Sequence, residues 1–216
     1  MKDLVIIGAG GFGREIVDRI RLIKEKTGKA EWNVVGLIDE NPNLKETVEG
    51  YKVLGNLEYY LNMENKPYFF VGIANSRVRE RIATICKAAG CKPATIIYPN
   101  IEMGIDVEIG EGCLICGDVI LRNEVKIGPF TVVQSNGIFG HDTKIGAYTS
   151  FMTDALVGGE TNIGSHCYFG LRSTVINQIN IVDGCTFGAC SCVVKDADVP
   201  GTYVGVPAKL IKPLQK

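Results

Sequence analysis

Hydrophobic and polar residues follow one pattern before about residue 100 and a different pattern after it. In the first part, short apolar runs alternate with segments whose apolar residues recur every three to four positions. The runs "DLVIIGAG", "WNVVGLIDE" and "YFFVGIAN" are typical of buried strands, and "GREIVDRIRLIKEK" and "SRVRERIATICKAAG" are typical of amphipathic helices. This alternation of strands and helices predicts an α/β domain with a parallel sheet over residues 1–98.

Residues 101–202 divide into seventeen hexads, which begin IEMGID, VEIGEG and CLICGD, and the third place is apolar in every one. Gly fills the fourth place in nine hexads, and the first place is mostly small or β-branched, as at Thr131 and Thr149. A hexapeptide repeat predicts a parallel β-helix over residues 99–216. Three hexads make one coil, so stacked residues are eighteen apart. The first and third places should point into the core, and we expect the fourth-place glycines to supply the backbone conformation of the corners.

Composition and charge narrow the class of protein. Charged residues make up 22% of the chain and the net charge is −1, which gives no reason to expect nucleic acid or an anionic membrane as a partner. The N-terminal apolar run is too short to span a bilayer and lacks the features of a signal peptide. We therefore expect a cytoplasmic protein with reduced cysteines. Cys113, Cys167 and Cys185 occupy first places, so we predict buried thiols and no metal site.

A glycine-rich loop joins the first strand to the first helix. Gly8, Gly10 and Gly13 form the pattern G-x-G-x-x-G, which lets backbone N–H groups approach a pyrophosphate. Asp39 and Glu40 end the second strand and offer acceptors to a ribose or a base. Because the segment supplies only one mononucleotide-binding half, we favour a nucleoside diphosphate sugar as the ligand. A dinucleotide and a loop without a ligand are the alternatives.

One histidine stands out in "GIFGHDTKIGAY". His141 fills the fifth place of its hexad and Asp142 follows it. An imidazole is suited to general-base catalysis near neutral pH, and a neighbouring carboxylate fixes its tautomer. The alternative is a solvated histidine at a turn. His166 has no acidic neighbour in sequence, so we expect a surface residue there. Two histidines are too few for a β-helix carbonic anhydrase with three per zinc, whereas a non-catalytic β-helix scaffold is not excluded by the repeat.

Taken together, "IIGAGGFGREIVD", "GHDTKIGAY" and "GVPAK" resemble the hexapeptide-repeat acyltransferases. Within them the chain resembles the subgroup that acylates nucleotide-linked sugars, which includes the bacillosamine- and perosamine-type N-acetyltransferases and the sialic-acid O-acetyltransferase-like proteins. The resemblance implies a Rossmann-like domain followed by a left-handed β-helix. It also implies acetyl-CoA as the co-substrate, and a homotrimer with active sites between subunits.

The resemblance further implies roles for single residues. His141 is the general base with Asp142 beside it, and a backbone N–H near "VGGE" meets the oxyanion. The nucleotide sugar is bound by Gly8, Gly10, Gly11, Phe12, Gly13, Asp39, Glu40, Ala74 and Asn75. Acetyl-CoA is bound by Gln134, Ser150, Gly159, Leu171 and Lys209. Relatives usually have Asn at the position of Gln134 and His at that of Ser150, so transfer to a hydroxyl instead of an amine is left open.

Overall fold

The computed structural model describes residues 1–29 and 31–214, and it contains two compact units, Met1–Thr95 and Ile96–Lys216. The boundary therefore lies slightly before the predicted one at residue 98. Strand β6 (Ile96–Ile97) pairs in parallel with β9 (Leu114–Ile115), and the Ile96 N–H donates to the Cys113 carbonyl at 2.8 Å. Ala94 still belongs to the α/β unit, because its N–H donates to the Phe69 carbonyl at 2.8 Å, and the first coil of the β-helix begins at Ile96.

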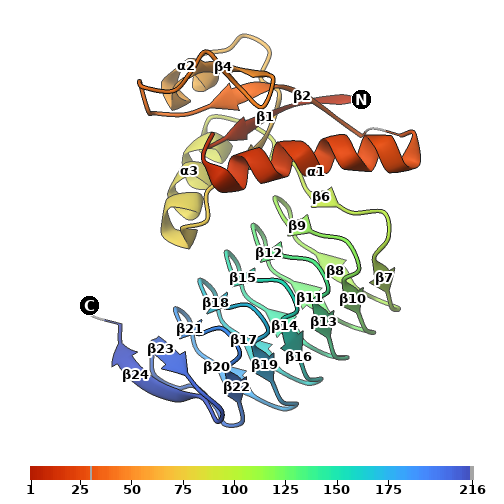
Figure 1. Cartoon of the computed structure of the whole chain (residues 1–216), viewed down its shortest axis with the longest axis vertical. Coiled ribbons are helices and arrows are strands. Elements are labelled where there is room, and N and C mark those ends of the chain that lie inside the picture. The colour runs from red at the N-terminus through yellow and green to blue at the C-terminus, as the bar shows by residue number, and fades with distance from the viewer. Residues whose placement is uncertain (30, 215–216) are drawn as a thin grey trace. The chain divides into compact units, whose positions relative to one another are not determined.

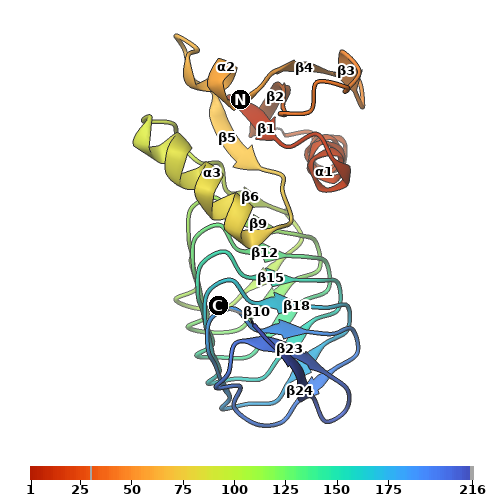
Figure 2. The ribbon, with the colours of Figure 1, turned by 90° about the vertical axis from the view of Figure 1, so that its left-hand side faces the viewer.

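The N-terminal unit is a five-stranded sheet in the order β3-β4-β2-β1-β5, with helices packed against it. Helices α1 and α3 lie on opposite sides of β5 in the view of Figure 2. The elements are β1 (Lys2–Ile7), α1 (Gly11–Thr27), β2 (Trp32–Ile38), β3 (Thr47–Val48), β4 (Tyr51–Gly55), α2 (Leu57–Leu61), β5 (Tyr68–Val71) and α3 (Ser76–Ala88). Strands β4, β2, β1 and β5 run parallel, which confirms the predicted Rossmann-like sheet.

Two short strands and one short helix in this unit were not expected from the sequence. Strands β3 and β4 form an antiparallel hairpin whose turn contains Gly50 in the left-handed region, at φ 80°. Helix α2 follows, and the Asn56 side chain caps it by accepting from the Tyr59 N–H at 2.9 Å. The segments carry little periodicity, and local turn and capping residues were their only signal.

The C-terminal unit is a left-handed parallel β-helix whose coils stack regularly, as Figure 1 shows. Its first face holds β7 (Glu102–Met103), β10 (Ile120–Leu121), β13 (Ile138–Phe139), β16 (Leu156–Val157), β19 (Thr174–Val175) and β22 (Cys192–Val193). The second holds β8 (Glu108–Ile109), β11 (Lys126–Ile127), β14 (Lys144–Ile145), β17 (Asn162–Ile163) and β20 (Asn180–Ile181). The third holds β6, β9, β12 (Val132–Val133), β15 (Ser150–Phe151), β18 (Tyr168–Phe169), β21 (Thr186–Phe187), β23 (Gly201–Val204) and β24 (Lys209–Pro213).

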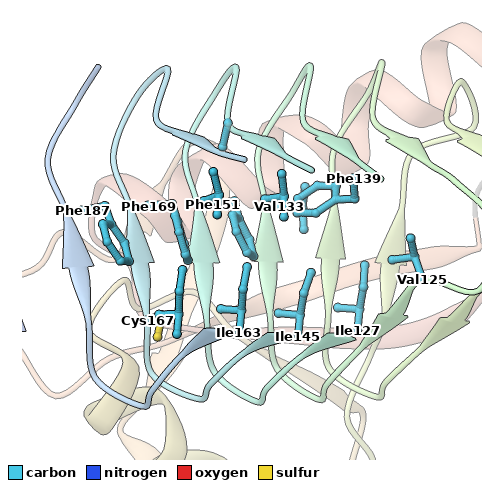
Figure 3. Close-up of a cluster of buried hydrophobic side chains, with 14 of the residues drawn as sticks. Val125, Ile127, Val133, Phe139, Ile145, Phe151, Ile163, Cys167, Phe169 and Phe187 are labelled. Atoms are coloured by element: carbon cyan, nitrogen blue, oxygen red, sulfur yellow. The ribbon is translucent and has the colours of Figure 1, made fainter. Parts of the chain in front are cut away.

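Third-place side chains form the core of the β-helix, as predicted. Figure 3 shows the column of Phe151, Phe169 and Phe187, whose neighbouring ring centroids are 4.5 and 4.8 Å apart. The two ends depart from the rule, because Met103 is 53% exposed and Val199 is 45% exposed. At the C-terminal end Ile181 bridges to Ala197, which shortens the last coil and buries Ala197 in the place expected for Val199.

At the corners, the residues with a positive φ are not the ones that were predicted. Positive φ angles occur at the sixth place of the hexads, for example 59° at Asp142 and 59° at Tyr148, and not at the fourth-place glycines. A Cβ on Gly140 would instead overlap the backbone nitrogen of Gly159 in the next coil. The fourth-place glycines are therefore needed because neighbouring coils approach each other closely.

Buried first-place side chains bond across the coils. Thr149 Oγ1 donates to the Gly164 carbonyl at 2.9 Å, and Thr131 Oγ1 donates to Gly146 at 3.1 Å. Cys113 and Cys167 occupy the same column, and their thiols make the equivalent contacts at 3.3 Å. The prediction of buried cysteines in the core is thereby confirmed. Among residues 1–29 and 31–214, no helix has both the length and the apolar character required to cross a bilayer.

Candidate active site

The glycine loop of the N-terminal unit is built for close backbone approach. Gly8 has φ 107°, and a Cβ there would lie 2.8 Å from Ile73 Cγ1. A Cβ on Gly13 would overlap the Gly8 carbonyl, so strand and helix meet at a distance that only glycine permits. Added Cβ atoms on Gly10 and Gly11 would meet nothing within 4 Å. Because α1 begins at Gly11, the N–H groups of its first turn lie in this loop, and the N-terminus of a helix favours an anion.

The two carboxylates after β2 are both held by backbone N–H groups. Asp39 Oδ2 accepts from the Ala9 N–H at 2.7 Å, and Asp39 Oδ1 accepts from the Asn41 N–H at 2.9 Å. Glu40 Oε1 accepts from the Leu57 N–H at 2.9 Å, at the start of α2. Asp39 thus fixes the glycine loop to the end of β2. Both residues were predicted to bind the ligand, and their hydrogen bonds to the backbone were not predicted.

The loop after β5 holds the other two residues predicted to bind the nucleotide sugar. Ala74 is exposed. Asn75 Oδ1 accepts from the N–H groups of Arg77 and Val78, at 3.1 Å each, and so caps α3. Arg79, which is 1% exposed, donates through Nη1 to the Ala74 carbonyl at 3.0 Å. The loop is therefore rigid, and contact between these residues and a ligand stays a prediction.

His141 and Asp142 form a close pair on the β-helix. His141 Nδ1 lies 2.7 Å from Asp142 Oδ2, with the two side chains 60% and 49% exposed. The left-handed conformation of Asp142 brings its carboxylate beside the preceding ring, and its N–H donates to the Asn123 carbonyl at 3.0 Å. A neutral imidazole that donates its Nδ1–H to the carboxylate presents the lone pair of Nε2 to a substrate.

Gly159 lies directly beside the His141 ring, one coil further along the chain. A Cβ on Gly159 would lie 3.0 Å from His141 Nε2 and 3.1 Å from both Cδ2 and Cε1. The Glu160 N–H also donates to the His141 carbonyl at 2.8 Å, which fixes the two coils to each other. The sequence predicted that Gly159 binds acetyl-CoA and that a backbone N–H near it meets the oxyanion, but it did not predict the contact with the His141 ring. The spacing of eighteen residues from His141 was the signal that would have revealed this contact.

The predicted acetyl-CoA residues do not form one cluster in the chain. Gly159 contacts His141, whereas Gln134, Ser150, Leu171 and Lys209 follow or belong to strands of the third face. Gln134 and Ser150 are only 7% and 5% exposed, and Gln134 Oε1 accepts from the Cys116 thiol at 3.4 Å. Leu171 is 54% exposed. Their role toward acetyl-CoA stays a prediction.

The second histidine is not the surface residue that we expected. His166 is half-buried, and its ring stacks on Tyr148 with centroids 5.3 Å apart. Tyr148 in turn stacks on Phe130 at the same distance. His166 is thus part of a column of rings at a corner of the β-helix. Throughout residues 1–29 and 31–214, no group of three His, Cys, Asp or Glu side chains is placed to hold a metal ion.

Comparison with known proteins gives one family match in the N-terminal unit and one sugar N-acetyltransferase as a relative. Residues 3–85 match the PglD N-terminal domain family. The predicted resemblance is confirmed. GDP-perosamine N-acetyltransferase of Escherichia coli O157:H7 is 32% identical over 111 residues, which cover 51% of this chain and 49% of that protein. The matched region therefore spans about half the length of this relative.

Solved structures similar to this chain extend the likeness beyond the PglD N-terminal domain. WeeI from Acinetobacter baumannii AYE has a TM-score of 0.83 and 29% identity, and the match covers 98% of this chain and 100% of that one. A histidine-to-asparagine mutant of perosamine N-acetyltransferase from Caulobacter crescentus, in complex with CoA and GDP-perosamine, has a TM-score of 0.85 and 23% identity, with 97% of each chain covered. The two likenesses show that the whole described fold is that of these proteins.

Proposed function

We propose that the protein is an acetyl-CoA-dependent N-acetyltransferase that acetylates the amine of a nucleotide-linked amino sugar, with His141 as the general base. The observation that carries the proposal is the contact of 2.7 Å between His141 Nδ1 and Asp142 Oδ2. It places an oriented imidazole on a rigid β-helix of the kind found in the similar acetyltransferases. The GDP-perosamine enzyme, whose name states this reaction, supports the choice of an amine acceptor.

The proposed reaction uses the His141–Asp142 pair and the two substrates. The sugar amine attacks the carbonyl carbon of the acetyl thioester while His141 Nε2 takes a proton from the amine, and the carbonyl electrons move to the oxygen. When the tetrahedral intermediate collapses, the C–S bond breaks and the imidazolium returns the proton to the CoA thiolate. Asp142 keeps the ring in one tautomer and stabilises its charged form. The transfer is direct and needs no acyl-enzyme.

The Gly159 N–H is our candidate for the oxyanion donor. The neighbouring Gly158 N–H is already used, because it donates to the Val175 carbonyl at 2.9 Å within the ladder. Gly159 fills a fifth place at a corner beside the imidazole, so its N–H lies near the reacting carbonyl. A fixed backbone donor of this kind contributes a factor of about 10² to 10³ in kcat.

Acetyl-CoA and a homotrimer belong to the same proposal. CoA is present in the Caulobacter crescentus structure, which supports acetyl-CoA as the donor. A trimer with active sites between subunits is supported by apolar side chains on the first face, since Ile138 and Leu156 are 38% and 39% exposed. Sedimentation of the purified protein tests the trimer, and a monomer in solution would contradict it.

Transfer to a sugar hydroxyl is the second candidate. Gln134 and Ser150 stand where relatives of the bacillosamine type have Asn and His, and a Ser side chain cannot replace a ring. The surroundings of the acceptor group therefore differ from those in the bacillosamine-type relatives. In this second candidate the acceptor is a hydroxyl, and the general base and the acetyl donor stay the same.

The test is thiol release from acetyl-CoA with UDP-, GDP- and dTDP-linked amino sugars, compared between the wild type, His141→Ala and His166→Ala. We expect release with one sugar, a loss of about 10² to 10⁴ in His141→Ala, and little change in His166→Ala. His166→Ala is the matched control, because it shows how the loss of a histidine other than His141 affects the rate. Equal activity of His141→Ala and the wild type would refute the general base, and release with hydroxyl acceptors alone would favour O-acetylation.

A further inference from the structure

The N-terminal unit contains a cavity of about 420 Å³ at the carboxyl ends of β1 and β2. Gly8, at the start of the glycine loop, lines one edge of it, and Leu57 at the start of α2 lines another. Ile82 and Ile85 of α3 contribute apolar walls. Gly8 also belongs to the loop that leads into the first turn of α1, which begins three residues later at Gly11. The cavity is thus suited to the base of a nucleotide whose phosphates lie at the glycine loop.

A carboxylate on one wall of this cavity is fixed in advance. Glu40 lines the cavity, and the Leu57 N–H holds its Oε1 at 2.9 Å. Within the described part of the chain, Glu40 makes no ion pair. Both oxygens of the neighbouring Asp39 already accept from backbone N–H groups. Glu40 is therefore the carboxylate with an oxygen left over for a ligand.

A cation lies on the α3 wall of the same cavity. Arg81 lines the cavity, and it forms no ion pair with any residue that the structure describes. The other charged residues at the start of α3 are satisfied by each other, because Arg77 Nη1 lies 3.6 Å from Glu80 Oε2. The cavity therefore combines one fixed acceptor group, one group with several donors, and apolar walls between them.

We propose that Glu40 and Arg81 are specificity-determining residues that select a guanine base in this cavity. The inference rests on the proposed function, because it identifies the base of the nucleotide sugar. Glu40 Oε2 is open to one donor, and Oε1 can accept a second hydrogen bond beside the one from the Leu57 N–H. The carboxylate therefore matches two adjacent donors, and guanine presents N1–H and the N2 amino group side by side. The planar guanidinium of Arg81 matches the adjacent acceptors O6 and N7.

The other common bases fit this pair of residues less well. Uracil and thymine have a single donor, N3–H, between two carbonyl oxygens, so a carboxylate there faces a lone pair on either side. Adenine has an amino group next to the acceptor N1, which faces the second carboxylate oxygen. Discrimination by a matched bidentate contact corresponds to roughly ten- to hundredfold in affinity.

The test measures binding, so that it is independent of acetyl transfer. Calorimetric titration of the full chain with GDP, UDP, dTDP and ADP should show GDP bound at least tenfold more tightly than the others. Glu40→Gln retains an acceptor for the Leu57 N–H but presents an amide to the base, and we expect GDP affinity to fall roughly ten- to hundredfold. Arg81→Met retains the apolar stem and should cause a similar loss. Arg77→Met, on the same helix and outside the cavity, is the matched control and should leave GDP affinity unchanged.

The outcomes separate this inference from the proposed function. Equal affinities for GDP and UDP, or equal effects of Arg81→Met and Arg77→Met, would overturn the inference even if the protein acetylates an amino sugar. Selective GDP binding without thiol release from any amino sugar would retain the inference and refute the proposed function. Circular dichroism checks that each variant is folded, and Arg81→Lys is a second variant, which should bind GDP with intermediate affinity because it keeps the charge but loses the planar fork.

Discussion

Replacing Gly159 by Ala tests whether the His141 ring depends on the missing side chain beside it. The new Cβ would lie 3.0–3.1 Å from three atoms of the imidazole, which is tighter than almost all real Cβ contacts. The ring must therefore shift by a few tenths of an ångström, and its contact with Asp142 must change with it. Gly159 is not among the residues with positive φ, so Ala is compatible with the backbone and the fold should be retained.

We expect Gly159→Ala to lower kcat, but by less than removal of the His141 imidazole would. A misplacement of about 1 Å costs on the order of 10² in rate, so a smaller shift should lower kcat about 10- to 100-fold. The backbone N–H survives the substitution, so oxyanion stabilisation is retained. If the added methyl group merely obstructed acetyl-CoA, KM for acetyl-CoA would rise while kcat stayed the same.

A double-mutant cycle gives the decisive measurement. Steady-state thiol release is compared for the wild type, Gly159→Ala, His141→Ala and the double variant. If Gly159→Ala acts through the imidazole, it should have almost no further effect once His141 is gone, which corresponds to a coupling energy of about 1.4–2.7 kcal/mol. An unchanged kcat in Gly159→Ala, or the same fold-loss in both backgrounds, would show that the reasoning is wrong.

Three further predictions concern the fold. Thr149→Val leaves the Gly164 carbonyl without its donor and should lower the free energy of unfolding, measured by urea titration, by about 1–3 kcal/mol. Thr149→Cys, the residue type found elsewhere in that column, should lower it by less. Equal effects of the two substitutions would contradict the role of the hydroxyl. Hydrogen bonds from Asn136 and Arg172 lower the pKa of the Asp154 carboxyl, so the stability that the carboxylate adds is present at neutral pH and is lost as the pH falls through the lowered pKa. The difference in unfolding free energy between the wild type and Asp154→Asn should therefore shrink as the pH is lowered below 3.8. A difference that stays constant with pH would refute this prediction. Cys190 is the one exposed cysteine among residues 1–29 and 31–214, so a thiol reagent should modify it first in the native protein, and Cys190→Ser should remove the fast phase.

The sequence predicted the β-helix well because its core obeys one periodic rule. Every hexad carries an apolar third place, and burial of those residues is a property of spacing alone. The rule failed at both ends of the β-helix. Met103 has a stacked neighbour on one side only, and at the other end Ala197 takes the buried place expected for Val199 because the last coil is shorter. The rule also gave the wrong reason for the fourth-place glycines. A positive φ favours glycine and a close approach of two backbones requires it, and one sequence cannot distinguish the two causes.

In the candidate site, the structure shows internal contacts that the sequence did not predict. Motifs indicated Asp39, Glu40 and Asn75, yet the structure shows each of them bonded to backbone N–H groups. Such bonds depend on where α2 and α3 begin, and the sequence pattern did not reveal α2. The cavity that contains Arg81 was missed for the same reason, since its walls come from β2, α2 and α3.

The contact between His141 and Asp142 follows from the geometry of the repeat. Sixth places repeatedly adopt the left-handed conformation, as Glu124, Asp142, Glu160 and Gln178 do along one corner. At Asp142 this conformation accompanies a contact of 2.7 Å between its carboxylate and the ring of the fifth-place residue before it. The fifth places are Asn123, His141, Gly159 and Asn177 in successive coils. His141 is the one imidazole among these four residues, and the glycine in the next coil leaves no side chain beside its ring. The proposed general base therefore depends on two residue choices, a histidine and a glycine eighteen positions later.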